Sequence, residues 1–186
     1  LLDNKSYSLQ EWLSILLLHA HNLQEQIDGW DALPFMPDQL LVDARKHARK
    51  GNLQGILSFF QDLEILTSSW ELLLQQLPTA APWSDTLRNF ARYMINRYWL
   101  QAVSDFDLVC RAKFIVISCI VVGSLGGDLV QTAQLFSKEI ENDPDNIESI
   151  LDGAAPDGIY KVKSTTETSD QGYNDEKSLL AAAQYL

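Results

Sequence analysis

The chain has 186 residues, of which 46% are apolar, and a formal net charge of −11. That length is usual for one domain with a full hydrophobic core, and so acidic a chain repels phosphate backbones, which excludes nucleic acid as an expected partner. The longest apolar run, Phe114 to Leu125, has about 12 residues where a bilayer-spanning helix needs about 20, so we expect no membrane crossing.

Two features indicate a part of a cytoplasmic protein. The chain begins Leu1-Leu2-Asp3, without an initiator methionine or a signal segment, and we expect it to be a piece of a longer protein. Cys110 and Cys119 are nine residues apart, so on one helix they lie about 13 Å apart along the axis and on opposite faces. Such thiols cannot pair, and we expect both to be reduced and buried.

The N-terminal part of the chain predicts two helices. Ser8 and Glu11 have the spacing of a capping box, and helically spaced apolar residues follow over 9–27. A loop with two prolines is predicted over residues 30–37. The second helix is expected over 38–50.

The middle of the chain predicts three more helices. Residues 52–76 are expected to be helical, with a break at 67–69. A serine cap opens an amphipathic helix over 84–102. After a polar break at 104–107, residues 108–125 are apolar nearly all round, as in a central buried helix.

The C-terminal part predicts two short helices, over 128–142 and 146–151, followed by a segment poor in bulky apolar residues. The sequence therefore predicts an all-α fold, an irregular bundle of about seven helices. Residues 1–153 are expected to form the helical domain, and residues 154–186 an acidic, partly flexible tail.

One segment offers an alternative to the helical prediction. Residues 114–122 are rich in β-branched side chains and precede Gly123, Gly126 and Gly127, an order that imitates the strand, glycine turn and helix of a nucleotide or S-adenosylmethionine site. However, no second strand pattern is present to complete a sheet, and the apolar run extends upstream to Leu108 at helical length. The helix is therefore favoured.

The sequence predicts no metal site and no nucleophilic enzyme. His19 and His21 point in opposite directions on a helix, and His47 lies among basic residues without a cysteine or carboxylate at ligand spacing. No nucleophile motif of the type G-x-S-x-G occurs.

A group of charged and aromatic residues surrounds the polar break between the two central helices. Its members are Arg92, Tyr93, Arg97, Tyr98, Asp105, Asp107, Arg111 and Lys113. Charges that enter an apolar region must be paired. Two interpretations stay open: an ion-pair network that locks the helices together, or the polar wall of a pocket.

Two stretches of the chain resemble the C-terminal region of the flagellin lysine-N-methylase family. Residues 89–116 read NFARYMINRYWLQAVSDFDLVCRAKFIV, similar to a family stretch in which an aromatic-rich helix leads through an acidic turn into a basic and then apolar helix. Residues 2–13, LDNKSYSLQEWL, are similar to a stretch just before the helical C-terminal region of that family. The two matches occur in the same order and together span roughly residues 1–125.

The resemblance implies a function. Members of this family methylate lysine side chains of flagellin in the cytoplasm, using S-adenosylmethionine. Their N-terminal part carries a cysteine cluster, thought to hold an iron–sulfur centre, and this chain has no such cluster. The fragment is therefore expected to be inactive by itself, with flagellin as the partner of its parent protein.

The chemistry of methyl transfer suggests candidate residues. Carboxylates and tyrosines suit the acceptor amine, aromatic faces suit a sulfonium cation, and a guanidinium suits the carboxylate of the donor. The catalytic candidates are Tyr98, Asp105 and Asp107. The cofactor-binding candidates are Tyr93, Arg97 and Arg111.

Two other functions fit a helical bundle of this length. One is the ligand-binding and dimerisation domain of a bacterial regulator, which would dimerise through an exposed pair of apolar helices. The other is a scaffold that docks flagellin and has no catalytic residues, for which an acidic surface suits a lysine-bearing partner.

Overall fold

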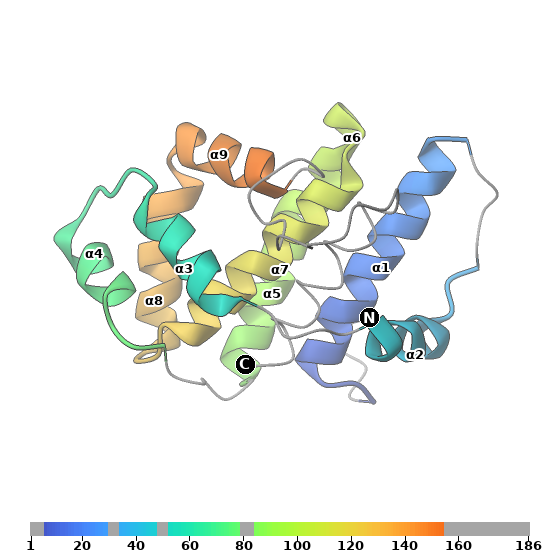
Figure 1. Ribbon diagram of the computed structural model, residues 1–186, viewed down its shortest axis with the longest axis horizontal. Coiled ribbons are helices and arrows are strands. Elements are labelled where there is room, and N and C mark those ends of the chain that lie inside the picture. The colour runs from blue at the N-terminus through green and yellow to red at the C-terminus, as the bar shows by residue number, and fades with distance from the viewer. Residues whose placement is uncertain (1–5, 30–33, 48–51, 79–83, 155–186) are drawn as a thin grey trace, which may run out of the picture.

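The computed structural model describes residues 6–29, 34–47, 52–78 and 84–154, and within these ranges the chain is helical without strands (Figure 1). The helices are α1 (Leu9–Ile27), α2 (Pro37–His47), α3 (Leu53–Gln61), α4 (Ser68–Leu74), α5 (Asp85–Tyr98), the 3₁₀ turn η1 (Trp99–Gln101), α6 (Ala102–Asp105), α7 (Leu108–Ser124), α8 (Leu129–Phe136), the π-helix η2 (Ser137–Glu141) and α9 (Pro144–Ala154). The all-α class is confirmed. Of the predicted tail, only Ala154 lies within the described residues, and it ends α9.

Helix α7 is the centre of the fold. Every residue from 112 to 124 is buried, because α7 packs against α1, α3, α5, α8 and α9 (Figure 1). The prediction of a helix that is apolar all round is confirmed, and the alternative strand and glycine turn is excluded because 108–124 form one helix. Cys110 and Cys119 are both free and buried, and burial raises the pKa of the Cys110 thiol to about 12.

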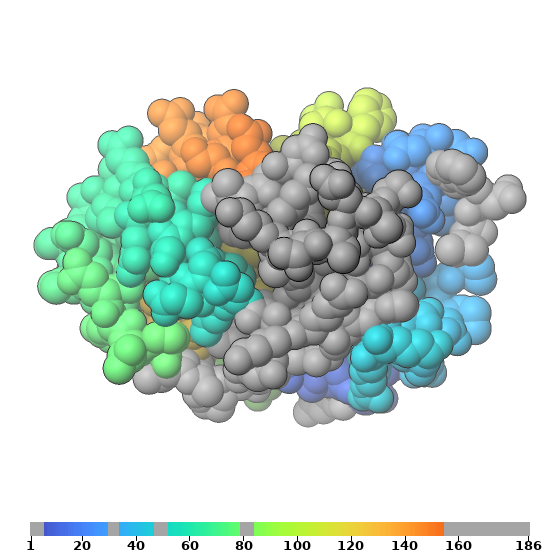
Figure 2. Space-filling model, viewed as in Figure 1, coloured from blue at the N-terminus to red at the C-terminus, as the bar shows by residue number. Residues whose placement is uncertain are grey.

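The start of α1 follows the predicted capping box. The Ser8 hydroxyl accepts the Glu11 amide at 3.2 Å, and the Glu11 carboxylate accepts the Ser8 amide at 2.8 Å. These two bonds satisfy amides that a helix start leaves unpaired. The apolar face of α1 then packs on α7 and α2, which places α1 and α2 together at one end of the molecule, opposite α3 and α4 (Figure 2).

The helix predicted over 52–76 is broken earlier than expected. The predicted break lies at 67–69, whereas α3 already ends at Gln61 and α4 begins at Ser68. Thr67 caps α4, because its hydroxyl accepts the amide three residues later. The loop between the two helices is therefore longer than the break inferred from the polar residues alone.

Side chains from distant helices hold this loop in place. The amide group of Asn146 accepts the Glu64 backbone N–H at 3.1 Å and donates to the Glu64 carbonyl at 2.9 Å. The Glu139 carboxylate accepts the Leu66 backbone N–H at 2.7 Å and also the hydroxyl of Thr67. Backbone groups that leave a helix must find other partners when buried, and η2 and α9 supply them here.

The polar break between α5 and α7 is a tight helical turn. Phe106 ends α6 in the left-handed conformation, with φ of 58°, a conformation costly for a residue with a Cβ atom. Gln24 of α1 fixes the turn, because its side chain donates to the Phe106 carbonyl and accepts the Leu108 amide, both at 2.9 Å. Among the helices of the described ranges, none has both the length and the hydropathy to cross a membrane.

Candidate functional site

The candidate site begins with an irregular helical turn. In η2 the Asn142 amide bonds the carbonyl of Ser137, five residues earlier, at 3.1 Å, which is the pattern of a π-helix. On a regular α-helix, residues 139 and 141 would point about 200° apart, and both could not face the core. The wider turn buries Glu139, Ile140 and Glu141 in succession. Single π turns of this kind occur frequently at functional sites.

The carboxylate of Glu141 is surrounded by groups from the end of α5. Its Oε1 atom accepts the hydroxyls of Tyr93 and Tyr98, each at 2.8 Å, and lies 3.1 Å from Nε of Arg97. Arg97 Nε also donates to the Tyr98 hydroxyl at 3.2 Å. We call these four residues the Glu141 cluster.

The second oxygen of Glu141 has no partner in the part of the chain that the structure describes. The Glu141 side chain is only 1% exposed, yet its Oε2 atom makes no hydrogen bond within the described residues. A buried polar atom left unpaired costs about 1–3 kcal/mol, and more when it is charged. All the donors of the cluster are thus directed at one oxygen, and the other is left with its acceptor capacity unused.

Both tyrosines are hydrogen-bond donors at neutral pH. Burial raises the pKa of Tyr98 well above its usual range; the hydrogen bond from Arg97 opposes this change and the bond to Glu141 adds to it. Burial and then the bond to Glu141 also raise the pKa of Tyr93. Because neither phenol ionises near neutral pH, both hydroxyls donate their hydrogens to the Glu141 carboxylate.

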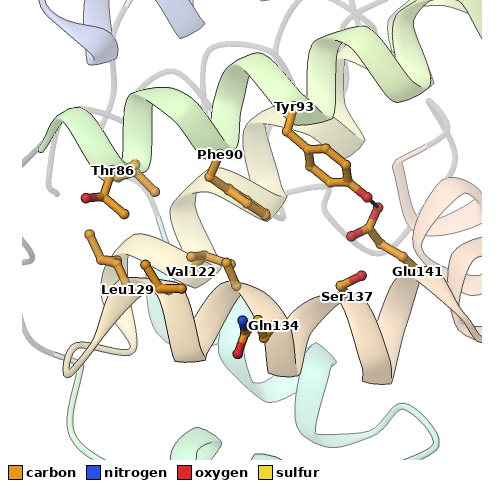
Figure 3. Close-up of a pocket in the computed structure, with 11 residues that line it drawn as sticks. Thr86, Phe90, Tyr93, Val122, Leu129, Gln134, Ser137 and Glu141 are labelled. Atoms are coloured by element: carbon orange, nitrogen blue, oxygen red, sulfur yellow. Dashed lines mark hydrogen bonds between the residues drawn. The ribbon is translucent and has the colours of Figure 1, made fainter.

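A groove of about 290 Å³ leads to Glu141 between α5 and the α8–η2 segment (Figure 3). Its apolar lining is formed by Leu87, Phe90, Val122, Leu129, Val130 and Ala133, and its polar lining by Thr86, Tyr93, Gln134, Ser137 and Glu141. Figure 3 shows the Tyr93 ring reaching from α5 to one carboxylate oxygen of Glu141, while the other oxygen points toward the side of the groove where Ser137 lies. The groove is therefore apolar along its length and acidic at one end.

The structure divides the six predicted site residues into two groups and a helix cap. Tyr93, Arg97 and Tyr98 join the Glu141 cluster. The other three candidates lie at the end of α6 and the start of α7, apart from that cluster in their contacts. The sequence therefore named three of the four cluster residues but did not separate them from their neighbours.

Asp105 and Arg111 form an ion pair at the turn before α7. Arg111 donates two bonds to Asp105 Oδ2, from Nε at 3.0 Å and from Nη2, and a third at 3.3 Å to Gln101. Burial acts to raise the pKa of Asp105, but the bonds from Arg111 and the Asp107 amide outweigh it and hold that pKa below its usual value. Asp107 caps α7 by accepting the Cys110 amide at 2.9 Å. At this turn, the geometry is that of the ion-pair lock rather than of a pocket wall.

Glu141 was missing from the sequence-based candidates. The helix predicted over 128–142 has Phe136 and Ile140 on its apolar side, and regular helical spacing directs residue 141 away from them. Only the π turn directs Glu141 toward the core, and no residue pattern in this segment predicts that turn. The one signal in the sequence is that Glu139 and Glu141 stand on either side of Ile140, a residue expected in the core.

The residues proposed for S-adenosylmethionine lie in two places, with Tyr93 and Arg97 in the Glu141 cluster and Arg111 at the turn before α7. The guanidiniums expected to bind the carboxylate of the donor, those of Arg97 and Arg111, are already engaged with Glu141 and Asp105. In addition, the groove has about 290 Å³, near the lower limit of roughly 300–1,000 Å³ for small-molecule sites. Among the described residues, no group of three histidines, cysteines or carboxylates is placed to share a metal ion.

Comparisons with known proteins give no relative: no family model, no curated protein and no solved structure matches the chain. The functional conclusion therefore depends on the geometry of the Glu141 cluster and on the sequence resemblance described above.

Proposed function

We propose that the chain is the C-terminal part of a cytoplasmic protein-lysine N-methyltransferase that methylates flagellin with S-adenosylmethionine, and that the Glu141 cluster holds the acceptor amine. The observation that carries this proposal is the unpaired Oε2 atom of Glu141, a buried carboxylate oxygen beside an apolar groove. A lysine side chain combines an apolar stem with a terminal amine, and the groove and the carboxylate match these two parts.

The charges of the cluster suit a lysine that binds as its ammonium form and loses a proton to solvent before it reacts. Transfer of a methyl group requires the neutral amine, and lysine is normally protonated at neutral pH. Arg97 lies 3.1 Å from the carboxylate and offsets part of its preference for the ammonium form, so the bound lysine can release its proton to solvent before methyl transfer. Glu141 accepts a hydrogen bond from the amine, while Tyr93 and Tyr98 fix the orientation of the carboxylate through its other oxygen.

The proposal assigns the remaining candidates supporting roles. Asp105 and Arg111 join α6 to α7, and Asp107 caps α7, so these groups maintain the position of the central helix against α5. Binding of the methyl donor, and the iron–sulfur centre that the resemblance implies, are assigned to the N-terminal part of the parent protein.

The test is the intact mass of flagellin coexpressed with the complete gene product that contains this chain. We expect mass increments in whole methyl units with the unchanged protein, and their loss with Glu141→Gln, which keeps the size of the side chain but removes its charge. Glu148→Gln is the matched control, because Glu148 is an exposed glutamate of α9. Unmodified flagellin with every version of the protein would contradict the methyltransferase proposal.

The groove itself favours a second candidate, the ligand-binding domain of a bacterial regulator. An apolar groove with one acidic end also suits a small effector, and such a domain needs no lysine substrate. This candidate predicts unmodified flagellin together with a stable dimer in gel filtration. Full methylation that persists in Glu141→Gln would instead favour a scaffold that docks flagellin without taking part in the chemistry.

A further inference from the structure

We propose that the groove between α5 and α8 is a channel for an unbranched alkylammonium group, with the stem between the two helices and the nitrogen bonded to Glu141 Oε2. The choice of lysine as the natural occupant rests on the proposed function. The choice of a cation with a linear apolar stem rests on the groove.

The charge of the lining selects a cation. Glu141 is the acidic residue among the groove-lining residues, and none of these residues is basic. Arg97 contacts the Oε1 atom of Glu141 and does not line the groove, so no guanidinium takes the place of a bound cation there. A carboxylate with one unpaired oxygen at the end of an apolar channel strongly favours an ammonium group over an anion or a neutral group.

The aromatic side of the groove also favours a cation as the bound group. The rings of Phe90 and Tyr93, one helical turn apart on α5, lie with their centroids 6.3 Å apart and their planes inclined at 34°. Both rings border the groove on the side that leads to Glu141 (Figure 3). Aromatic faces attract ammonium groups, most strongly where water is excluded.

The size and polarity of the channel favour a narrow stem. Leu129, Val130 and Ala133 line the groove from α8. Ser137 follows on η2 beside Glu141, and its hydroxyl supplies an acceptor for a second ammonium hydrogen. Along the groove, the apolar wall contacts the methylenes of a lysine side chain, and the hydroxyl and the carboxylate that follow accept hydrogen bonds from its nitrogen.

The experiment titrates the full chain with n-hexylammonium and follows binding by saturation-transfer NMR. Two comparison probes of the same length, 1-hexanol and hexanoate, separate the apolar and charge contributions. We expect n-hexylammonium to bind at least about tenfold more tightly than either comparison probe, because only the cation pairs with the carboxylate. Equal binding of the cation and the alcohol would overturn the proposal.

Three variants locate the binding. Glu141→Gln removes the charge, and Ala133→Phe fills the channel without altering the Glu141 cluster. Gln131→Phe is the matched control, because Gln131 is an exposed residue of α8 outside the lining. We expect the first two changes to weaken n-hexylammonium binding about tenfold or more and the control to leave it unchanged, with circular dichroism showing that all three variants stay folded.

The outcomes distinguish this inference from the proposed function. Binding of n-hexylammonium that depends on Glu141 and on Ala133, together with unmodified flagellin, would support the channel and contradict the methyltransferase. Methylated flagellin, together with n-hexylammonium binding that is absent or indifferent to Ala133→Phe, would support the enzyme and overturn the channel.

Discussion

Glu139 and Glu141 lie two residues apart on the same π turn, and both are buried, yet they use their carboxylates differently. Both oxygens of Glu139 accept hydrogen bonds, from the Leu66 amide and the Thr67 hydroxyl. Among the described residues, the partners of Glu141 all bond its Oε1 atom and none bonds Oε2. A buried carboxylate with both oxygens bonded fastens one part of the chain to another, whereas a buried carboxylate with one unbonded oxygen requires another explanation, which the proposed amine site supplies for Glu141.

The largest effect is expected at Glu139, where the comparison predicts a purely structural role. Glu139→Ala leaves the Leu66 amide and the Thr67 hydroxyl without partners, and we expect the free energy of unfolding to fall by about 3 kcal/mol. Urea denaturation of the chain measures this difference. If Glu139→Ala lowered the free energy of unfolding no more than a substitution at an exposed residue does, Glu139 would not have the structural role that distinguishes it from Glu141.

Asn146 of α9 also holds the loop between α3 and α4, and its substitution is a second test of that attachment. Its side chain makes three bonds at 2.9–3.1 Å, two with the backbone of Glu64 and one with the Glu139 carbonyl. Asn146→Ala is expected to lower the free energy of unfolding by about 2 kcal/mol, less than Glu139→Ala, because no charged group is involved. Equilibrium urea titration checks this ranking, and a larger loss for Asn146→Ala than for Glu139→Ala would reverse it.

Glu141 is expected to separate stability from function. Glu141→Gln keeps a carbonyl acceptor for the two tyrosines and replaces the unpaired charged oxygen with a neutral amide group, while the lost partner Arg97 is 47% exposed and contributes little. We expect the free energy of unfolding to change by less than about 1 kcal/mol, with methylation of flagellin lost. A decrease in stability equal to that of Glu139→Ala would assign both glutamates the same structural role.

The smallest effect is expected at the turn before α7. The pKa of Asp105 is held below its usual value, so its charge stabilises the fold above the unfolded-state pKa of about 3.9, and this contribution disappears as the pH falls below that value through the folded-state pKa. Because the Asp105 side chain is 37% exposed, Asp105→Asn is expected to cost less than about 1 kcal/mol at pH 7. Urea titrations at pH 7 and pH 3 should show a larger difference between variant and unchanged protein at pH 7 than at pH 3.

The sequence was most informative where local chemistry decides the structure. The capping box at Ser8 and Glu11 and the apolar residues over 108–124 specify helices through contacts within a few residues or through burial on all sides. The early end of α3 could not be predicted, because the loop that follows depends on the side chains of Glu139 and Asn146. These partners become visible only when the helices are packed.

The candidate site was only partly predictable for the same reason. Tyr93, Arg97 and Tyr98 lie near the end of α5 and were identified from their types as members of a larger group of charged and aromatic residues. Their common partner Glu141 is more than 40 residues away in the sequence, as shown by its bond to Tyr98. Residue type thus identified the donors, and tertiary structure alone identifies the acceptor.

The fastening of the loop between α3 and α4 has a consequence for the order of folding. Its partners come 73 and 82 residues later in the chain, at Glu139 and Asn146. At about 5–20 residues per second, a ribosome needs roughly 4–16 s to synthesise the 82 residues between Glu64 and Asn146. The α3–α4 segment therefore emerges long before the groups that complete its backbone hydrogen bonds, and this end of the molecule is expected to become protected from proteolysis only when synthesis has passed α9.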